Sequence, residues 1–131
     1  KSIVIGDFSG VKQKNKAKSF VQIPQQQLVE KIKYKAELLG MEVIMQEESY
    51  TSGCSSLDLE VVSKKYYNKS RRIQRGLFKS NTGKLINADV NGSLNIMRKY
   101  FKKKEIECTP KLIELVMDNG FLDNPIRLRV A

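Results

Sequence analysis

The first 47 residues carry the pattern that most constrains the fold, because they predict a strand, a helix and a second strand. The run Ser2–Asp7 (SIVIGD) is apolar and ends in a turn, which is typical of a buried strand. Pro24 suits the first position of a helix and Gly40 suits its end, and residues 41–47 form a second apolar strand. This order predicts a right-handed crossover between two parallel strands.

Apolar side chains in the predicted first helix recur at helical spacing, and this spacing predicts the face that the helix buries. They are Leu28, Ile32, Ala36 and Leu39. Residues 9–23 are polar and rich in lysine, so we expect a loop there. Residues 49–86 show no sustained period and are rich in Ser, Lys, Arg and Gly, which indicates an insertion.

A second amphipathic helix is predicted to begin at Asn87, with one buried face formed by Val90, Leu94, Met97 and Phe101. Asp89 borders that face, so we expect its carboxylate to lie near a packing seam rather than in open water. The alternative interpretation is that Asn87 caps the helix and the helix dipole favours Asp89. A short helix over about residues 110–118 and an irregular tail follow.

Positive charge is abundant and clustered, with 24 Lys and Arg against 14 Asp and Glu, giving a net charge of +10. Such clustering is typical of proteins that bind polyanions. No lipidation motif, apolar amphipathic stretch, bilayer-spanning run or signal peptide favours a membrane, so nucleic acid is the predicted partner. The three clusters are Lys12, Lys14, Lys16 and Lys18; Arg71, Arg72, Arg75 and Lys79; and Arg98, Lys99, Lys102, Lys103 and Lys104.

Cysteine usage argues against a structural metal. Cys54 and Cys108 have no CxxC partner, and the chain contains no histidine. Structural zinc takes four Cys or His ligands, so we expect no ordinary zinc site. A disulfide is not required by the pattern, and the usage fits a reducing cytoplasm.

Acidic residues stand where a parallel sheet presents functional groups. Asp7 ends the first predicted strand, Glu47 and Glu48 end the second, and Asp89 opens the helix expected over the sheet. Converging carboxylates are what a two-metal phosphodiesterase needs to hold Mg²⁺ ions about 4 Å apart. The alternative is that Glu47 and Glu48 are solvated loop acids.

Five motifs follow one another in a fixed order along the chain. They are IVIGDF at residues 3–8, YKA at 34–36, EESYTS at 47–52, RGLF at 75–78 and NADVNG at 87–92. This ordered set resembles the C-terminal half of TnpB, the transposon-encoded RNA-guided nuclease related to type V CRISPR effectors, over residues 2–101. The resemblance implies an α/β fold, the C-terminal half of the RuvC-like variant of RNase H, with parallel strands, packed helices and a Lys/Arg-rich insertion.

The resemblance also implies a metal-dependent DNA endonuclease that uses Mg²⁺ or Mn²⁺. Most of that family carries its middle catalytic Glu where this chain has Gly6. A subset has Gly-Asp there and a Glu just before Tyr-Thr-Ser, so the implied catalytic and metal-binding residues are Glu48 and Asp89. Glu47 and Asp7 are the alternative carboxylates. Side-chain alternation sends Glu47 and Glu48 to opposite faces, so we expect only one of them to serve.

The insertion departs from the zinc ribbon of the family, which uses two CxxC pairs. Cys54 remains, Leu57 stands where its partner would be, and residues 75–84 contain no cysteine. We therefore expect no zinc, and an insertion held by packing of Tyr66, Tyr67, Leu77 and Phe78. Arg75 is the candidate for reaching a scissile phosphate, and the alternative is that it is a solvated basic loop residue. The residues expected at the nucleic acid are Thr51, Ser52, Arg71, Arg72, Arg75 and Lys79.

The expected organisation is a RuvC-like strand-helix-strand over 1–48, the insertion over 49–86, RuvC-like C-terminal helices over 87–118 and a tail over 119–131. A RuvC site also needs an Asp on the first strand of its sheet. We therefore expect an upstream part of the same protein, bound to guide RNA and target DNA, with this piece inactive alone and able to form a homodimer through its exposed sheet edge. The alternative is a nuclease-dead, nucleic-acid-binding relative such as a guided repressor.

Overall fold

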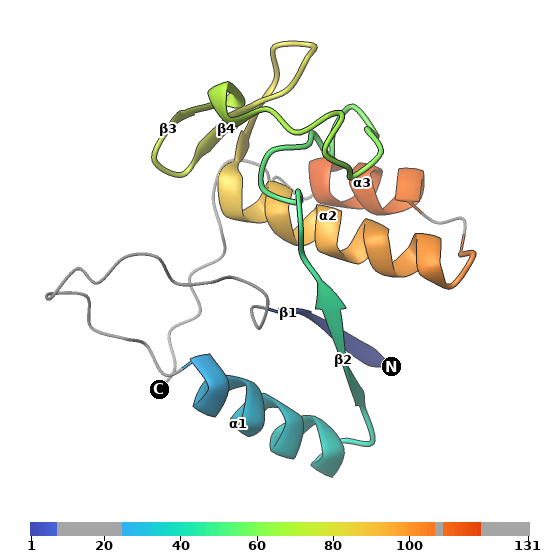
Figure 1. Cartoon of the computed structure of the whole chain (residues 1–131). Helices are drawn as coiled ribbons and strands as arrows, with labels where there is room; N and C mark the ends of the chain where they lie inside the picture. The colour runs from blue at the N-terminus through green and yellow to red at the C-terminus, as the bar shows by residue number, and fades with distance from the viewer. Residues whose placement is uncertain (8–24, 107–108, 119–131) are drawn as a thin grey trace, which may run out of the picture. The chain divides into compact units, whose positions relative to one another are not determined.

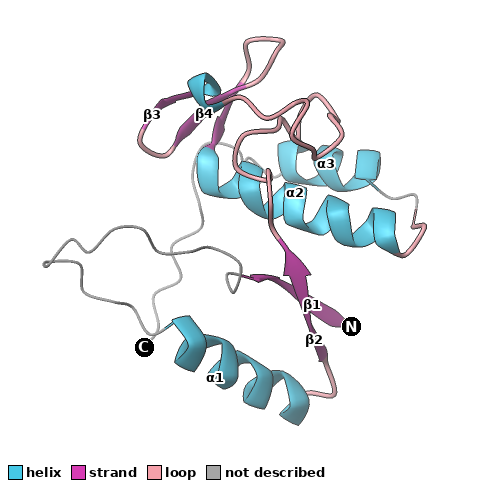
Figure 2. Cartoon of the chain, in the orientation of Figure 1, coloured by secondary structure: helices cyan, strands magenta, loops and turns pink. Residues whose placement is uncertain are grey.

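The computed structural model describes residues 1–7, 25–106 and 109–118, so the predicted 9–23 loop and 119–131 tail lie outside the described residues. The chain divides into two compact units, Lys1–Glu47 and Glu48–Ala131. One parallel strand pair and one antiparallel three-stranded sheet accompany the helices (Figure 1, Figure 2), which confirms the predicted α/β class. In the described ranges, no helix has the length and apolar character needed to cross a membrane.

The first unit is built on two parallel strands, β1 (Ser2–Asp7) and β2 (Glu42–Glu47). Their register pairs Ile3 with Val43 at one end and Asp7 with Glu47 at the other. The predicted parallel pair is therefore confirmed, and the carboxyl ends of both strands lie side by side.

Helix α1 (Gln25–Leu38) connects these strands and ends as predicted at Gly40. Gly40 has a φ of +63°, its N–H donates to the Glu37 carbonyl, and the Met41 N–H donates to the Ala36 carbonyl. These bonds form the Schellman arrangement that satisfies the last carbonyls of a helix, and a left-handed residue there favours glycine.

The predicted apolar face of α1 is only partly correct. Ala36 is buried and Ile32 is half-buried, but Leu28 and Leu39 are 53% and 72% exposed. Helix α1 packs on β2 within a sheet of only two strands. So narrow a sheet covers only a thin stripe along the helix, and Leu28 and Leu39 remain in solvent.

The second unit contains the 3-10 helix η1 (Lys69–Arg71) and the strands β3 (Arg72–Gln74), β4 (Leu77–Lys79) and β5 (Leu85–Asn87). The strands form an antiparallel sheet in the order β3-β4-β5. Residues 49–86 show no sustained period and so do not reveal this sheet in the sequence, because strands of three residues are too short to show a period of two.

The apolar core of the second unit lies between this sheet and helix α2 (Ala88–Lys103). Phe78 and Ile86 are register partners on β4 and β5, and both are fully buried. Ala88 and Leu94 of α2 complete the cluster. Helix α3 (Thr109–Asp118) confirms the short helix expected over about residues 110–118.

Packing of the predicted insertion is partly as expected. Phe78 is fully buried, and Leu77 and Tyr67 are half-buried, whereas Tyr66 is 38% exposed. Gly53 allows a close approach, because a Cβ there would come within 2.5 Å of the Tyr67 ring. The Tyr67 ring therefore covers the backbone of the loop that precedes the sheet.

Candidate nucleic-acid interface

Helix α2 holds the loop of residues 51–56 through a buried asparagine. The Nδ2 atom of Asn91 donates to the Cys54 carbonyl at 2.9 Å. Its Oδ1 atom accepts from both the backbone N–H and the hydroxyl of Ser56, each at 2.9 Å. Asn91 is fully buried, so its amide is satisfied by the loop rather than by water.

A second buried asparagine, one helical turn later, repeats this arrangement. The Nδ2 atom of Asn95 donates to the carbonyls of Thr51 at 2.9 Å and Cys54 at 2.8 Å. Its Oδ1 atom accepts from the Arg98 guanidinium at 2.8 Å. The face of α2 against the loop is therefore partly polar, and the predicted apolar face of Val90, Leu94, Met97 and Phe101 is correct chiefly at buried Leu94.

Asp89 lies in the first turn of α2, directly after the helix cap. The Asn87 side chain accepts from the backbone N–H groups of Asp89 at 2.9 Å and Val90 at 3.2 Å, which confirms the capping interpretation. The Asp89 side chain is 89% exposed, so the expectation that it lies at a packing seam is wrong. The buried face of α2 is centred on Asn91 and Asn95 rather than on the predicted apolar residues. Asp89 lies outside this face and is therefore exposed to solvent.

Glu48 lies alongside the middle of α2 rather than its start. Its carbonyl accepts from the backbone N–H of Thr51 at 3.1 Å and from the Thr51 hydroxyl at 2.8 Å. The Thr51 carbonyl in turn binds Asn95, six residues after Asp89. At 1.5 Å per residue, Asp89 is about 9 Å along the helix axis from that contact. A shared role for Glu48 and Asp89 stays a prediction.

The alternative carboxylates, Asp7 and Glu47, end neighbouring parallel strands as register partners. Asp7 is half-buried and Glu47 is exposed. Across the described ranges, no three or more His, Cys, Asp and Glu side chains are grouped so as to hold a metal ion.

Three of the predicted nucleic-acid-binding side chains lie on the hairpin formed by β3 and β4. Arg72, Arg75 and Lys79 are all exposed, and we call them the basic hairpin. The Nη2 atom of Arg72 is 4.0 Å from the Asp89 carboxylate, so the hairpin borders the start of α2. A nucleic-acid strand bound by the basic hairpin would pass close to Asp89.

Arg71 behaves differently from the basic hairpin that follows it. Its Nη1 atom forms an ion pair with Glu60 at 2.6 Å, and its Nη2 atom donates to Asn81 at 2.6 Å. The hydrogen bond that Arg71 donates to the Glu60 carboxylate raises the pKa of Arg71. The Arg71 side chain is only 17% exposed, and its hydrogen bonds are made to Glu60 and Asn81 of the same unit.

Thr51 and Ser52 also differ from each other. Thr51 is buried, and its hydroxyl donates to the Glu48 carbonyl, so this side chain stabilises the loop. Ser52 is exposed and open to solvent on the same loop. Of the two, Ser52 is the one whose side chain is placed to meet an external strand.

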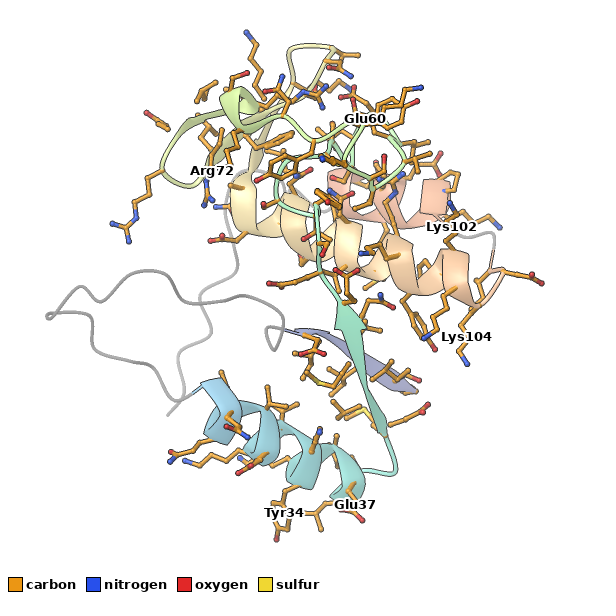
Figure 3. The ribbon with its side chains drawn as sticks, in the orientation of Figure 1. Tyr34, Glu37, Glu60, Arg72, Lys102 and Lys104 are labelled. Carbon is orange, nitrogen blue, oxygen red and sulfur yellow. The ribbon has the colours of Figure 1, made fainter. Side chains whose placement is uncertain are left out.

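The third basic cluster is also divided by burial. Lys102 and Lys104 are exposed at the end of α2 (Figure 3), where positive charge complements the helix dipole. Arg98 is half-buried, and burial lowers its pKa despite the nearby carboxylate of Glu60. Its Nε atom is buried and has no hydrogen-bond partner among the described residues.

The sequence interpretation missed the polar residues that hold this interface together: Asn81, Asn91, Asn95 and Glu60. Asn91 and Asn95 are spaced by four residues on the stripe of α2 that borders Leu94, and this spacing is the signal that could have revealed them. Glu60 and Asn81 have no such signal, because their partners are distant in sequence.

A search of the curated proteins found no significant match. The chain does match the protein family described as Cas12f1-like, TNB domain, over residues 26–96. The matched region runs from the beginning of α1 through the first turns of α2, and so includes the sheet, Glu60 and Asp89. Because this match covers more than half of the 131 residues, the chain belongs to the Cas12f1-like TNB-domain family.

Proposed function

We propose that this chain is the RuvC-like nuclease portion of an RNA-guided, metal-dependent DNA endonuclease of the TnpB type. Family membership supports the proposal, since it points to the nuclease family of TnpB and Cas12 and implies nucleic-acid binding. The net charge of +10 is consistent with a polyanionic partner.

The observation that carries the proposal is the setting of Asp89. Its carboxylate is 89% exposed beside Arg72 of the basic hairpin, although capping of α2 is already provided by Asn87. An acid of this kind is available to an external ligand. The neighbouring cation would bring a phosphodiester close to it.

The proposed metal ligands are Glu48 and Asp89, with Glu47 and Asp7 as the alternative carboxylates. Mg²⁺ typically uses one or two carboxylates, together with waters and substrate phosphate oxygens, so Asp89 fits as one ligand of a single ion. When bound, Mg²⁺ would activate a water molecule and stabilise the leaving oxygen. The protein's own contribution is to hold Asp89 on α2 and Glu48 on the neighbouring loop, and to bind the nucleic-acid strand.

Binding of the strand is assigned to the exposed cations of the second unit. The basic hairpin of Arg72, Arg75 and Lys79 would contact phosphates, and Arg75 remains the candidate for the scissile one. Ser52 is available to donate a hydrogen bond to the backbone of the strand. Such contacts position a nucleic acid without selecting its sequence, which in this proposal is the task of the guide RNA.

The test compares cleavage and binding in the same preparation, with this chain in its complete protein and loaded with guide RNA. Asp89→Ala should lower Mg²⁺-dependent cleavage of labelled single-stranded DNA at least about 100-fold, whereas binding of that DNA should change less than about twofold. Glu114→Ala, an exposed acid on α3, is the matched control and should cleave normally. Undiminished cleavage by Asp89→Ala would contradict the proposal.

A nuclease-dead, nucleic-acid-binding protein, such as a guided repressor, is the second candidate. The observation that favours it is that no three potential metal ligands are grouped anywhere in the described residues. Wild-type protein that binds guide and target but never cuts in Mg²⁺ or Mn²⁺ would establish this candidate over the first.

A further inference from the structure

The zinc that a ribbon of this kind would use does not fit the residues present. The chain has two cysteines and no histidine, and zinc ribbons need four such ligands. Cys54 is fully buried, with its thiol 3.5 Å from the Ser63 carbonyl, to which it donates. Some other interaction must therefore connect the two turns that the metal would join.

The carboxylate of Glu60 provides this connection. Its Oε2 atom accepts from the backbone N–H of Ser55 at 2.8 Å and from Arg71 at 2.6 Å. Its Oε1 atom accepts from the Asn81 amide at 2.6 Å. Glu60 thus joins its own turn to residues 11 and 21 positions later in the chain.

Two further contacts close the cluster into a ring. Arg71 donates to the Asn81 side chain at 2.6 Å, and the backbone N–H of Asn81 donates to Asp58 at 2.7 Å. We call Asp58, Glu60, Arg71 and Asn81 the Glu60 clamp. The Glu60 side chain is only 8% exposed, so its bonds compete little with water.

We propose that the Glu60 clamp replaces the structural zinc of the ribbon, so that this unit folds without metal. In a zinc site, anionic thiolates converge on a cation, whereas here N–H donors converge on an anion. The cross-link is therefore centred on an anion instead of on a cation. Because no thiolate is needed, the unit is insensitive to chelators and to oxidation of ribbon cysteines.

The clamp also has a consequence for the interface. Arg71 ends η1 and immediately precedes Arg72, the first residue of β3. By fixing Arg71, the clamp anchors the base of the basic hairpin next to α2. Arg71 is therefore a positioning residue, and Arg72 and Arg75 are left to meet the ligand. This inference rests on family membership and not on nuclease activity, so the two can fail separately.

The test is thermal unfolding of the full, tag-free chain, with and without an excess of a zinc chelator. The melting temperature of the wild type should move by less than about 1 °C on chelation, and elemental analysis should find zinc well below stoichiometry. Glu60→Gln removes the charge at nearly constant shape and should lower the melting temperature by about 5–10 °C. Glu114→Gln, an exposed glutamate of the same unit, should leave it unchanged.

Arg71→Lys provides a second variant if Glu60→Gln does not fold. Lysine keeps the charge but cannot reach Glu60 and Asn81 at once, so a loss of about 3–5 °C is expected. Stoichiometric zinc, or a fall of more than about 5 °C on chelation, would overturn the proposal. Wild-type stability in both clamp variants would overturn it as well.

Discussion

The two compact units are stabilised in different ways, and the difference determines how much the sequence reveals about each. Lys1–Glu47 is held by the backbone hydrogen bonds of a helix and two parallel strands, with Ala36 of that helix buried. Glu48–Ala131 buries polar side chains beside its apolar core, including Ser56, Asn91 and Asn95 at 0% exposure. Hydrophobic spacing therefore describes the first unit better than the second.

The largest expected effect is in the polar face of α2. Asn95→Leu would make this face more apolar, but it leaves the Thr51 carbonyl and one donor of Arg98 without their partner, and it removes one of the two amide donors to the Cys54 carbonyl. Leaving buried polar groups unpaired destabilises the fold more than the added apolar contact stabilises it. We therefore expect a loss of about 3 kcal/mol in the free energy of unfolding. Urea denaturation followed by circular dichroism measures this.

The matched control lies in the other unit. Leu28→Gln changes an exposed leucine of α1 and should alter the free energy of unfolding by less than about 0.5 kcal/mol. Equal stability of Asn95→Leu and the wild type would contradict the claim that buried polar side chains stabilise the second unit, because apolar burial would then dominate in both units.

Much of the first unit could be predicted from its residues alone. The first strand occupies Ser2–Asp7 as expected, and the second begins at Glu42, one residue later than predicted. Gly40 ends the helix because its left-handed φ suits glycine, a preference that acts locally and is therefore visible in sequence. The exposure of Leu28 depends on the width of the sheet, which no local pattern reports.

The second unit was less predictable because its contacts are distant in sequence. The pairs of Glu60 with Arg71 and of Asn91 with Ser56 follow no helical or strand period. For the candidate site, the cap at Asn87 could be predicted from its neighbours. The exposure of Asp89 could not, since it depends on which face of α2 the preceding loop covers.

A smaller change in the free energy of unfolding is expected when the pH is lowered. Burial alone would raise the pKa of Glu60, but hydrogen bonds from Arg71, Ser55 and Asn81 and the charge of Arg71 outweigh it, so the pKa is lowered. Arg71 is the neighbouring cation whose charge lowers it. A lowered pKa stabilises the folded state above the ordinary value, about 4.3, and this contribution is lost as the pH falls through the lowered pKa.

Urea midpoints measured between about pH 6 and pH 3 test this linkage, a range that brackets the ordinary pKa of a glutamate. The wild type should lose more stability on acidification than Glu60→Gln, which has no carboxylate to protonate at this position. Glu114→Gln should follow the wild type. Parallel curves for the wild type and Glu60→Gln would show that the clamp does not couple to protonation.

The salt dependence of single-stranded DNA binding tests most directly the claim that the second unit carries the nucleic-acid surface. We expect the slope of log affinity against log salt to fall by about 2 when Arg72, Arg75 and Lys79 are all changed to Gln, because three phosphate contacts are lost. Lys31, Lys33 and Lys35 of α1, likewise exposed, are changed to Gln as the control with equal charge, and the slope should be retained. Equal losses in both triple variants, or a loss only in the α1 variant, would contradict it.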